Sequence, residues 1–405
     1  MIVSAITSEY NPFHNGHKYH IAKTRQITEA DFIISVMSGN FVQRGEPALF
    51  DKWTRTRLAL ENGADMVIEL PAFFSCSGAE FFAGAAVSIM ESCGIVNNIS
   101  FGIESGTIDD IKNTGKFFSD ETDEFKKLLS QYMSMGISYP SAREKAMSSL
   151  LPNIPQFSPN NILAIEYIKA LCRIKSKINP VGIDRSDNGY NSLVPKENMA
   201  SATAIRQMIL NGGIENTAEY MPLNAFNIMK KEYSLGNIVT KESMSQILSY
   251  AVRTKTPNEL SKILDVREGL ENKIIKMDSL CSGFEKIAFA VKSKRYSLTS
   301  IQRALMHIIL NVKSADMEFY KSKGFSPYIR VLGFRKNSSL LLKKLKDNSA
   351  IPVILNLKKD EAILDENGKF IIDFEKTADN IYYMCSHNPN NRGTGKDYTT
   401  PVVIA

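Results

Sequence analysis

The sequence predicts an α/β fold built on a parallel sheet, and three observations indicate it. Five short apolar runs rich in β-branched residues are spaced along the first half of the chain. Helical patterns separate these runs, and strands joined by helical crossovers form parallel sheets. With 405 residues, the chain is long enough for two domains. We therefore expect a Rossmann-like parallel sheet in residues 1–225 and a mainly helical α+β domain in residues 226–405.

The first 105 residues alternate strand and helix. Helices are predicted from about His17, at 51–62 before Gly63, and at 77–92 before Gly94, because glycine commonly follows the last helical residue. Proline donates no backbone N–H, so a proline ends the third strand. The four strands are predicted at residues 2–7, 31–37, 64–70 and 98–104.

The remainder of the first domain is expected to be mainly helical, with one more strand. The pattern predicts helices within 108–151 and at 160–174, a fifth strand at 178–184, and a loop rich in Gly, Asn and Ser at 185–195. A further helix begins at Ser201.

The second domain is expected to begin with helices and to end with short strands. Helical patterns cover residues 241–313, and strand-like runs follow at 328–332 and 352–357. Residues 386–400 are polar and rich in Asn and Gly, so we expect a loop there.

Composition excludes several classes of protein. The chain has no apolar run of about 18 residues, so no membrane span is predicted. It begins with a predicted strand, which disfavours a signal peptide. The five cysteines are scattered and form no Cys-x-x-Cys pair, which indicates a reducing cytosol and no structural zinc. We therefore expect a cytoplasmic protein.

The most informative stretch is residues 7–20, where the first strand is followed by a helix. Ligands bind at this edge of an open α/β sheet, and the helix N-terminus favours a phosphate. The imidazoles of His14 and His17 can both donate to phosphate oxygens as charge builds at phosphorus. Gly16 lets the backbone approach a nucleotide closely. Three of the five histidines of the chain lie here, which disfavours an incidental turn.

Two other segments suit a nucleotide. In Ser201-Ala-Thr-Ala-Ile-Arg206, hydroxyls at a helix start can bind phosphate oxygens and Arg206 adds a guanidinium. The same Ser and Thr would also suit a plain N-capped helix. Gly102, at the end of the fourth strand, leaves room for a base or ribose, although a glycine kept for packing would look the same.

These motifs resemble those of a known superfamily. His14-Asn-Gly-His17 is similar to the His-x-Gly-His motif of the nucleotidylyl-transferases, and residues 201–206 resemble their Ser-x-Thr-x-Ile-Arg segment. Residues 38–48, 65–71 and 158–164 narrow the resemblance to the bacterial tRNA(Met) cytidine acetate ligases, over essentially the whole chain. The resemblance implies a nucleotidyltransferase domain that activates acetate with ATP. The resulting acetyl-adenylate would acetylate N4 of the wobble cytidine of elongator tRNA(Met), giving N4-acetylcytidine, AMP and pyrophosphate.

The same resemblance implies the residues that serve the reaction. His14 and His17 would stabilise the transition state, with Mg²⁺ held mostly by ATP oxygens and water, because no carboxylate pair suggests a metal site in the protein. The loop at residues 39–44 would close over acetate or the tRNA base; an ordinary surface loop is the alternative. The expected ATP-binding residues are Thr7, Ser8, Glu9, Tyr10, Asn11, Pro12, Phe13, His14, Asn15, Gly16, His17, Lys18, Tyr19, His20, Gly102, Asn161, Arg185, Ser201 and Thr203. Asn161 also fits a helix cap, and Arg185 a solvated loop charge.

Positive charge is concentrated in the second domain. Residues 241–345 contain 20 Lys and Arg against 9 Asp and Glu, although the whole chain is only +6. Backbone phosphates of RNA attract such cations. We expect tRNA contacts from Lys292, Lys294, Arg295 and Arg303, with a solvated helix face as the alternative.

Other functions remain open from the residues alone. A small-molecule nucleotidyltransferase, for adenylyl or cytidylyl transfer, would use the same histidine pair but would not need a basic second domain. A class I aminoacyl-tRNA synthetase would also carry a Lys-Met-Ser-Lys-Ser loop, which is absent. A non-enzymatic RNA-binding protein would not need both phosphate motifs. An acetyl-CoA-dependent acetyltransferase would need a glycine-rich turn after a strand, and Arg392-Gly-Thr-Gly-Lys396 lies in the polar tail.

Overall fold

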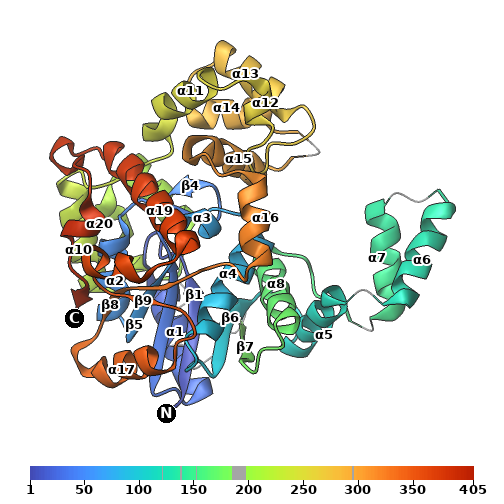
Figure 1. Ribbon diagram of the computed structural model, residues 1–405, viewed down its shortest axis with the longest axis horizontal. Helices are drawn as coiled ribbons and strands as arrows, with labels where there is room; N and C mark the ends of the chain where they lie inside the picture. The colour runs from blue at the N-terminus through green and yellow to red at the C-terminus, as the bar shows by residue number, and fades with distance from the viewer. Residues whose placement is uncertain (121, 137–138, 152, 185–197, 294–295) are drawn as a thin grey trace.

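The computed structural model describes residues 1–120, 122–136, 139–151, 153–184, 198–293 and 296–405. Its centre is a twisted sheet flanked by helices on both faces (Figure 1). Five parallel strands lie in the order β5-β2-β1-β6-β7, which corresponds to strands 3-2-1-4-5 of the Rossmann order 3-2-1-4-5-6. All five were predicted from the sequence. Their bounds are β1 Val3–Ser8, β2 Phe32–Ser38, β5 Met66–Leu70, β6 Asn98–Ile103 and β7 Asn179–Asp184.

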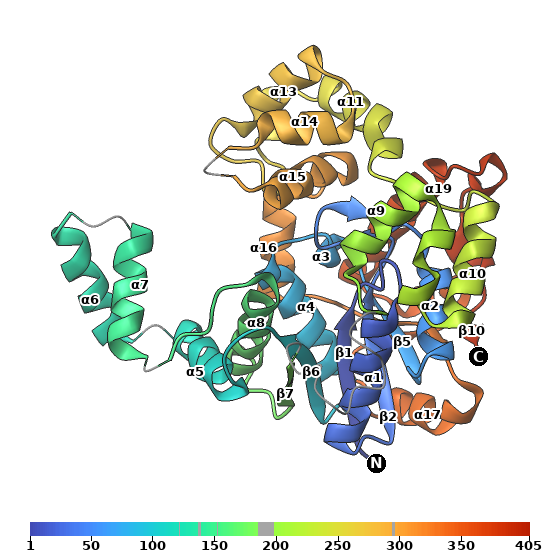
Figure 2. The same cartoon turned by 180° about the vertical axis from the view of Figure 1, so that it is seen from behind.

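The strands are apolar on both faces because each face is covered by helices. Side chains on the two faces of one strand pack in different cores. Ile33 and Val36 of β2, both fully buried, belong to separate apolar clusters. One face packs against α1 (Asn15–Thr28), α2 (Lys52–Glu61), α9 (Ala202–Gly212) and α10 (Leu223–Ser234), which lie together in Figure 2. The other face packs against α4 (Ala79–Ser92) and α8 (Pro159–Arg173).

The C-terminal part of the chain completes the same sheet. β8 (Ile329–Phe334) pairs antiparallel with β5, and both β9 (Val353–Ile354) and β10 (Val403–Ile404) pair with β8. We expected these runs in a separate second domain, and we expected a strand over 352–357. The structure instead shortens that strand to two residues and adds the runs to the sheet of the first domain. A domain boundary near residue 225 therefore stays a prediction. It applies to the helical segment that follows residue 225, and not to the strands after residue 328.

A helical subdomain, residues 245–310, covers the carboxyl ends of the parallel strands (Figure 1). Its helices confirm the predicted helical segment, and α16 (Ser314–Ser322) connects it back toward the sheet. Gly45, at φ +73°, lies where an added Cβ would come within 2.3 Å of the backbone nitrogen of Arg303, so the loop after β2 packs directly on α15. The helices are α11 Ser245–Arg253, α12 Pro257–Leu260, α13 Leu270–Leu280, α14 Phe284–Val291 and α15 Leu298–Leu310.

The remaining elements are short or peripheral. The loop predicted at 39–44 contains a small hairpin, β3 (Phe41–Val42) and β4 (Glu46–Pro47), and α6 and α7 project from the body as a helical hairpin (Figure 1). None of the described helices is long and apolar enough to span a bilayer. The other helices are α3 Ala72–Ser75, α5 Ile108–Ser119, α6 Asp123–Ser134, α7 Tyr139–Leu150, α17 Ser339–Asn348, α18 Leu357–Asp360, α19 Glu366–Met384 and α20 Lys396–Thr399, and the 3₁₀ turns are Ile214–Tyr220, Glu242–Met244, Lys336–Ser338, Glu361–Ile363 and Pro389–Asn391.

A buried cluster of charges joins the C-terminal helices to the sheet. The Lys52 ammonium contacts Glu69 at 2.7 Å, Asp379 at 2.6 Å and Asp397 at 2.9 Å. Arg330 binds Asp397 through two hydrogen bonds of 3.0 and 3.1 Å. Each of the two cations contacts at least two carboxylates. These contacts offset the cost of burying the charges in a low-dielectric interior. Asp397 lies within residues 386–400, where we expected a polar loop. In the structure it is buried at the start of α20 and forms ion pairs there.

Candidate active site

The histidine turn is built by the start of α1. His14 is the N-cap of the helix, and its Nδ1 accepts a hydrogen bond from the Gly16 N–H at 3.0 Å. In return, Nδ1 of His17 accepts from the His14 N–H at 3.3 Å. The two rings stack with centroids 3.7 Å apart. With Nδ1 accepting, the proton of each neutral imidazole is on Nε2, which makes Nε2–H the donor that each ring can offer a phosphate oxygen. The helix begins two residues before the predicted start at His17.

A cavity of about 460 Å³ lies beside this turn, at the carboxyl ends of β1 and β6. This is the edge, between the first and fourth parallel strands, at which ligands bind in such sheets. Several predicted ATP-binding residues line the cavity together. They are Thr7, Ser8, Glu9, Tyr10, His17, His20 and Gly102.

Other predicted residues, including His14, are not among the residues that line the cavity. Asn11 accepts a hydrogen bond from the Leu49 N–H at 2.8 Å, and Asn15 donates to the Asn198 carbonyl at 3.1 Å. Asn161 is buried and binds the backbone of the turn after β6. Pro12 and Phe13 are buried, Gly16 and Tyr19 are half-buried, and Lys18 is exposed. Direct nucleotide contacts from these residues stay predictions.

The predicted phosphate segment forms the start of α9. Ser201 is its N-cap, accepting from the Ala204 N–H at 3.2 Å, which is the plain capping role considered above. Thr203 accepts from Arg44 at 3.4 Å and from Arg206 at 3.3 Å. Arg206 pairs with Glu46 at 2.6 Å, so part of its charge is already used within the protein. Arg185 lies outside the described residues.

The sequence did not reveal several residues that complete the cavity. Tyr167 of α8 forms a hydrogen bond with the Thr7 hydroxyl, and burial raises the pKa of Tyr167 well above its ordinary value. Thr299 comes from α15. The remaining residues of this kind are Ile6, Ile21, Ala79, Phe82, Phe101, Pro159, Asn160, Ile162 and Leu163. Gln43 and Arg44, from the loop expected to close over acetate or the tRNA base, also line the cavity, as does Arg303, which we expected as a tRNA contact.

A buried arginine fixes the two loops that meet at the cavity. The guanidinium of Arg55 donates to the carbonyl of Glu9 at 2.7 Å and to those of Ser38 and Gly39 at 3.0 and 2.5 Å. It therefore joins the end of β1 to the end of β2. Tyr10, next along the chain, adopts φ 47°, a left-handed conformation that is uncommon for an aromatic residue. Such strain persists where surrounding contacts determine the backbone, as these do.

The predicted RNA-binding residues separate in the structure. Lys292 is exposed directly after α14, whereas Arg303 lines the cavity and its Nε contacts Asp265 at 3.2 Å. Lys294 and Arg295 lie outside the described residues. The basic segment, residues 241–345, is also divided between two parts of the structure. Residues 241–313 carry 13 Lys and Arg against 7 Asp and Glu.

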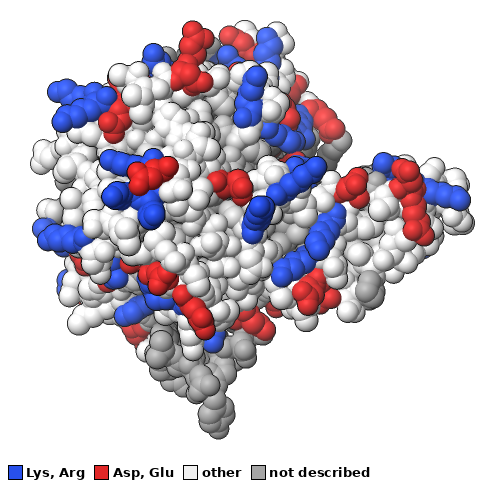
Figure 3. Space-filling model, turned by 60° about the horizontal axis from the view of Figure 1, so that its bottom comes forward, with Lys and Arg blue, Asp and Glu red and all other residues white. Residues whose placement is uncertain are grey.

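The other basic residues of that segment include those of α17, at the opposite end of the molecule from the helical subdomain (Figure 1). On the face shown in Figure 3, Lys and Arg are interspersed with Asp and Glu, so the described residues there form no continuous basic surface. The tRNA contacts expected in the helical subdomain stay predictions.

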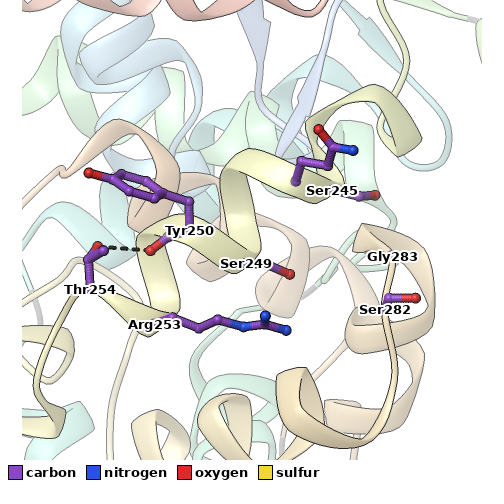
Figure 4. Close-up of a pocket in the computed structure, with 8 residues that line it drawn as sticks. Ser245, Ser249, Tyr250, Arg253, Thr254, Ser282 and Gly283 are labelled. Carbon is purple, nitrogen blue, oxygen red and sulfur yellow. Dashed lines mark hydrogen bonds between the residues drawn. The ribbon is translucent and has the colours of Figure 1, made fainter.

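A second hollow lies within the helical subdomain itself (Figure 4). Tyr250 and Arg253 of α11 line it, together with Ser282 and Gly283 of the segment before α14. The Arg253 guanidinium contacts the buried Asp278 at 2.8 Å, so its charge is neutralised. No histidine is among the described residues that line this hollow, in contrast to the first cavity.

Comparisons with known proteins agree with the geometry. Residues 1–397 match the family model for HIGH Nucleotidyl Transferase. The chain is 42% identical over 365 residues to the tRNA(Met) cytidine acetate ligase of Clostridium novyi (strain NT), covering 89% of this chain and 91% of that relative. It is 38% identical over 420 aligned positions to the tRNA(Met) cytidine acetate ligase of Halothermothrix orenii, covering 100% and 99%. A crystal structure of Thermotoga maritima TmcAL bound with alpha-thio ATP matches with a TM-score of 0.90 and 30% identity, covering 100% of this chain and 99% of that one.

Proposed function

Because the chain belongs to the tRNA(Met) cytidine acetate ligase family of HIGH nucleotidyl transferases, we propose that it joins acetate to N4 of the wobble cytidine of elongator tRNA(Met) at the expense of ATP. The observation that carries the proposal is the stacked histidine pair at the N-terminus of α1, beside a cavity at the sheet's carboxyl edge. A related chain of the same fold binds an ATP analogue.

The first step is activation of acetate. An acetate oxygen attacks the α-phosphorus of ATP, pyrophosphate leaves with the electron pair of the broken P–O bond, and acetyl-adenylate forms. The Nε2–H groups of His14 and His17 donate to the phosphate oxygens on which negative charge builds in the transition state. The N-terminus of α1 adds its positive helix end.

Mg²⁺ fits this site only if it binds together with ATP. The described residues contain no group of three or more His, Cys, Asp and Glu side chains that could hold a metal. Among the described residues that line the cavity, Glu9 is the single carboxylate. Mg²⁺ on the nucleotide would neutralise phosphate charge, with ATP oxygens and water as its main ligands. The role of the protein would be to orient the phosphates.

The second step transfers the acetyl group to tRNA. The cytidine amine can reach the acetyl-adenylate only if the base leaves its stack and enters the cavity, as in other enzymes that modify bases. The helical subdomain stands above that cavity and contributes Thr299 and Arg303 to its wall. We place the tRNA along this subdomain. A cytoplasmic location stays a prediction from the five cysteines, all of which are free thiols.

Radiolabelled acetate tests the reaction. With ATP and unmodified elongator tRNA(Met), label should enter the tRNA as N4-acetylcytidine, with one AMP and one pyrophosphate formed for each acetyl group. Parallel reactions supply acetyl-CoA in place of acetate plus ATP, or a tRNA with uridine at the wobble position. Label from acetyl-CoA, or none from acetate, would contradict the proposal. Transfer of AMP to a small acceptor without acetylation would instead support a small-molecule nucleotidyltransferase.

A further inference from the structure

The transfer step needs a proton acceptor that the histidine pair does not provide. When the exocyclic amine of cytidine attacks the acetyl carbonyl, its nitrogen becomes positively charged and must lose a proton. A general base within hydrogen-bond reach of the amine accelerates such a step by roughly 10²–10⁴-fold. Nδ1 of both His14 and His17 already accepts a backbone N–H at the start of α1.

Glu9 is placed to accept that proton. It follows β1 directly, and its side chain lines the cavity between the histidine turn and the loop after β2. One carboxylate oxygen, Oε1, accepts a hydrogen bond from the Gln43 N–H at 2.9 Å. No described residue donates a hydrogen bond to the other oxygen, Oε2. The Arg55 guanidinium holds the Glu9 carbonyl at 2.7 Å, which fixes the backbone that carries the side chain.

The surroundings of Glu9 suit a base better than a phosphate ligand. A carboxylate repels the phosphates of ATP, whereas it attracts the positive charge that develops on the amine nitrogen during attack, so Glu9 suits the acceptor. Burial raises the pKa of Glu9, and Glu46 raises it further, whereas the Gln43 N–H, Arg206 and Arg44 lower it. A carboxylate with a raised pKa is a stronger proton acceptor.

Other titratable groups of the cavity are less suitable. Burial raises the pKa of Tyr10 and of Tyr167, so both phenols stay protonated near neutral pH. His20 contacts the Ser100 hydroxyl through Nε2 at 3.2 Å, and Arg303 is a cation paired with Asp265. Glu9 is therefore the group among the described lining residues that combines a cavity position with an available acceptor oxygen.

We propose that Glu9 is the general base of acetyl transfer. The amine nitrogen forms a bond to the acetyl carbon, the bond from that carbon to the adenylate oxygen breaks, and AMP leaves with its electron pair. The amine proton moves to Glu9 Oε2. This inference rests on the proposed function, since it concerns the second half of the same reaction.

The test separates the two half-reactions in a Glu9→Gln variant. Acetate-dependent exchange of labelled pyrophosphate into ATP reports adenylate formation, and single-turnover acetylation of tRNA(Met) reports transfer. We expect exchange within about threefold of wild type, and transfer slower by roughly 10²–10⁴-fold. The wild-type transfer rate should rise with pH and then level off as Glu9 ionises, and this dependence should be absent from the variant.

Matched measurements keep the inference falsifiable. Glu29→Gln makes the same change at an exposed position after α1 and should leave both half-reactions unaltered. Thermal denaturation shows whether Glu9→Gln is folded. If the folded variant loses pyrophosphate exchange as well, Glu9 acts in activation or through magnesium and the inference is wrong. If transfer persists at the wild-type rate, it is equally wrong. A wild-type protein that incorporates no acetate would refute the proposed function instead.

Discussion

His14 combines a structural and a chemical role in one side chain. Its Nδ1 caps α1, while its Nε2 is the atom that can meet a phosphate. Histidine is not among the favoured N-cap residues, so a sequence pattern would not suggest the cap. The reciprocal bond from the His14 N–H to His17 makes the two rings one unit. The chemistry and the local fold can nevertheless be separated by substitution.

A His14→Asn variant should separate them. Asn is a strong N-cap, so the stability of the variant should stay within about 0.5 kcal/mol of wild type. Loss of the imidazole donor should slow adenylate formation by roughly 10²–10³-fold, as for removal of one oxyanion donor. Urea denaturation and acetate-dependent pyrophosphate exchange measure the two effects. His14→Ala, which removes both functions, should lose about 1 kcal/mol in addition. Near-normal exchange in the Asn variant would exclude a catalytic His14.

At the scale of elements, the helical subdomain serves both the cavity and the proposed tRNA surface. Its α15 contributes Thr299 and Arg303 to the cavity wall, and Gly45 allows the loop after β2 to pack against that helix. The exposed Lys292, directly after α14, remains available for an RNA phosphate. Helix α17 carries a comparable exposed Lys344 far from the subdomain (Figure 1).

Charge reversal at these two lysines should have different effects. Lys292→Glu should weaken tRNA binding, most strongly at low salt, and should reduce the slope of log affinity against log salt by about one unit. Lys344→Glu makes the same change of charge and should leave tRNA affinity unaltered. Filter binding over a series of salt concentrations measures both variants, and ATP binding serves as the control for folding. Equal losses in the two variants would show only a general charge effect.

The elements near the histidine turn could largely be predicted, because their signals are local. Strand periodicity, Pro71 and the His-x-Gly-His spacing all lie within short windows of sequence. Residues far apart in the chain could not be placed in this way. Thr7 meets Tyr167 across 160 positions, and Arg303, which we expected as a tRNA contact, could not be placed in the cavity wall before the fold was known. Strand β10 has only two residues and therefore no periodicity to detect, whereas β9 lies within the longer run predicted at 352–357.

At the scale of the whole molecule, buried charges connect the two ends of the chain. Glu375 of α19 accepts from the Phe73 N–H at 3.1 Å and is buried beside Glu69. Burial, then repulsion by Glu69, raises the pKa of Glu375 from 4.5 to about 8, although Lys52 opposes the change. Its Oε2 finds no hydrogen-bond partner among the described residues. In the unfolded chain the same group ionises near its ordinary pKa.

This difference predicts how stability changes with pH. Because the folded-state pKa of Glu375 is raised, its contribution is fully present below pH 4.5 and is lost as pH rises toward 8. Glu375→Gln should remove that loss, on the order of 3 kcal/mol across the interval. Urea unfolding at pH 5 and pH 8 measures it as the difference between wild type and variant. Parallel pH profiles for the two proteins would contradict a protonated Glu375 in the fold.

Asp397 neutralises both Lys52 and Arg330, although 345 positions separate it from the first of them. While the ribosome is still making the protein, an emerging chain that ends just before this aspartate leaves the Arg330 guanidinium with Glu69 alone, a carboxylate that it shares with Lys52. A prematurely terminated product would contain every histidine of the proposed active site but would lack a fully formed core. Proteolytic quality control should therefore remove such fragments before they occupy tRNA unproductively.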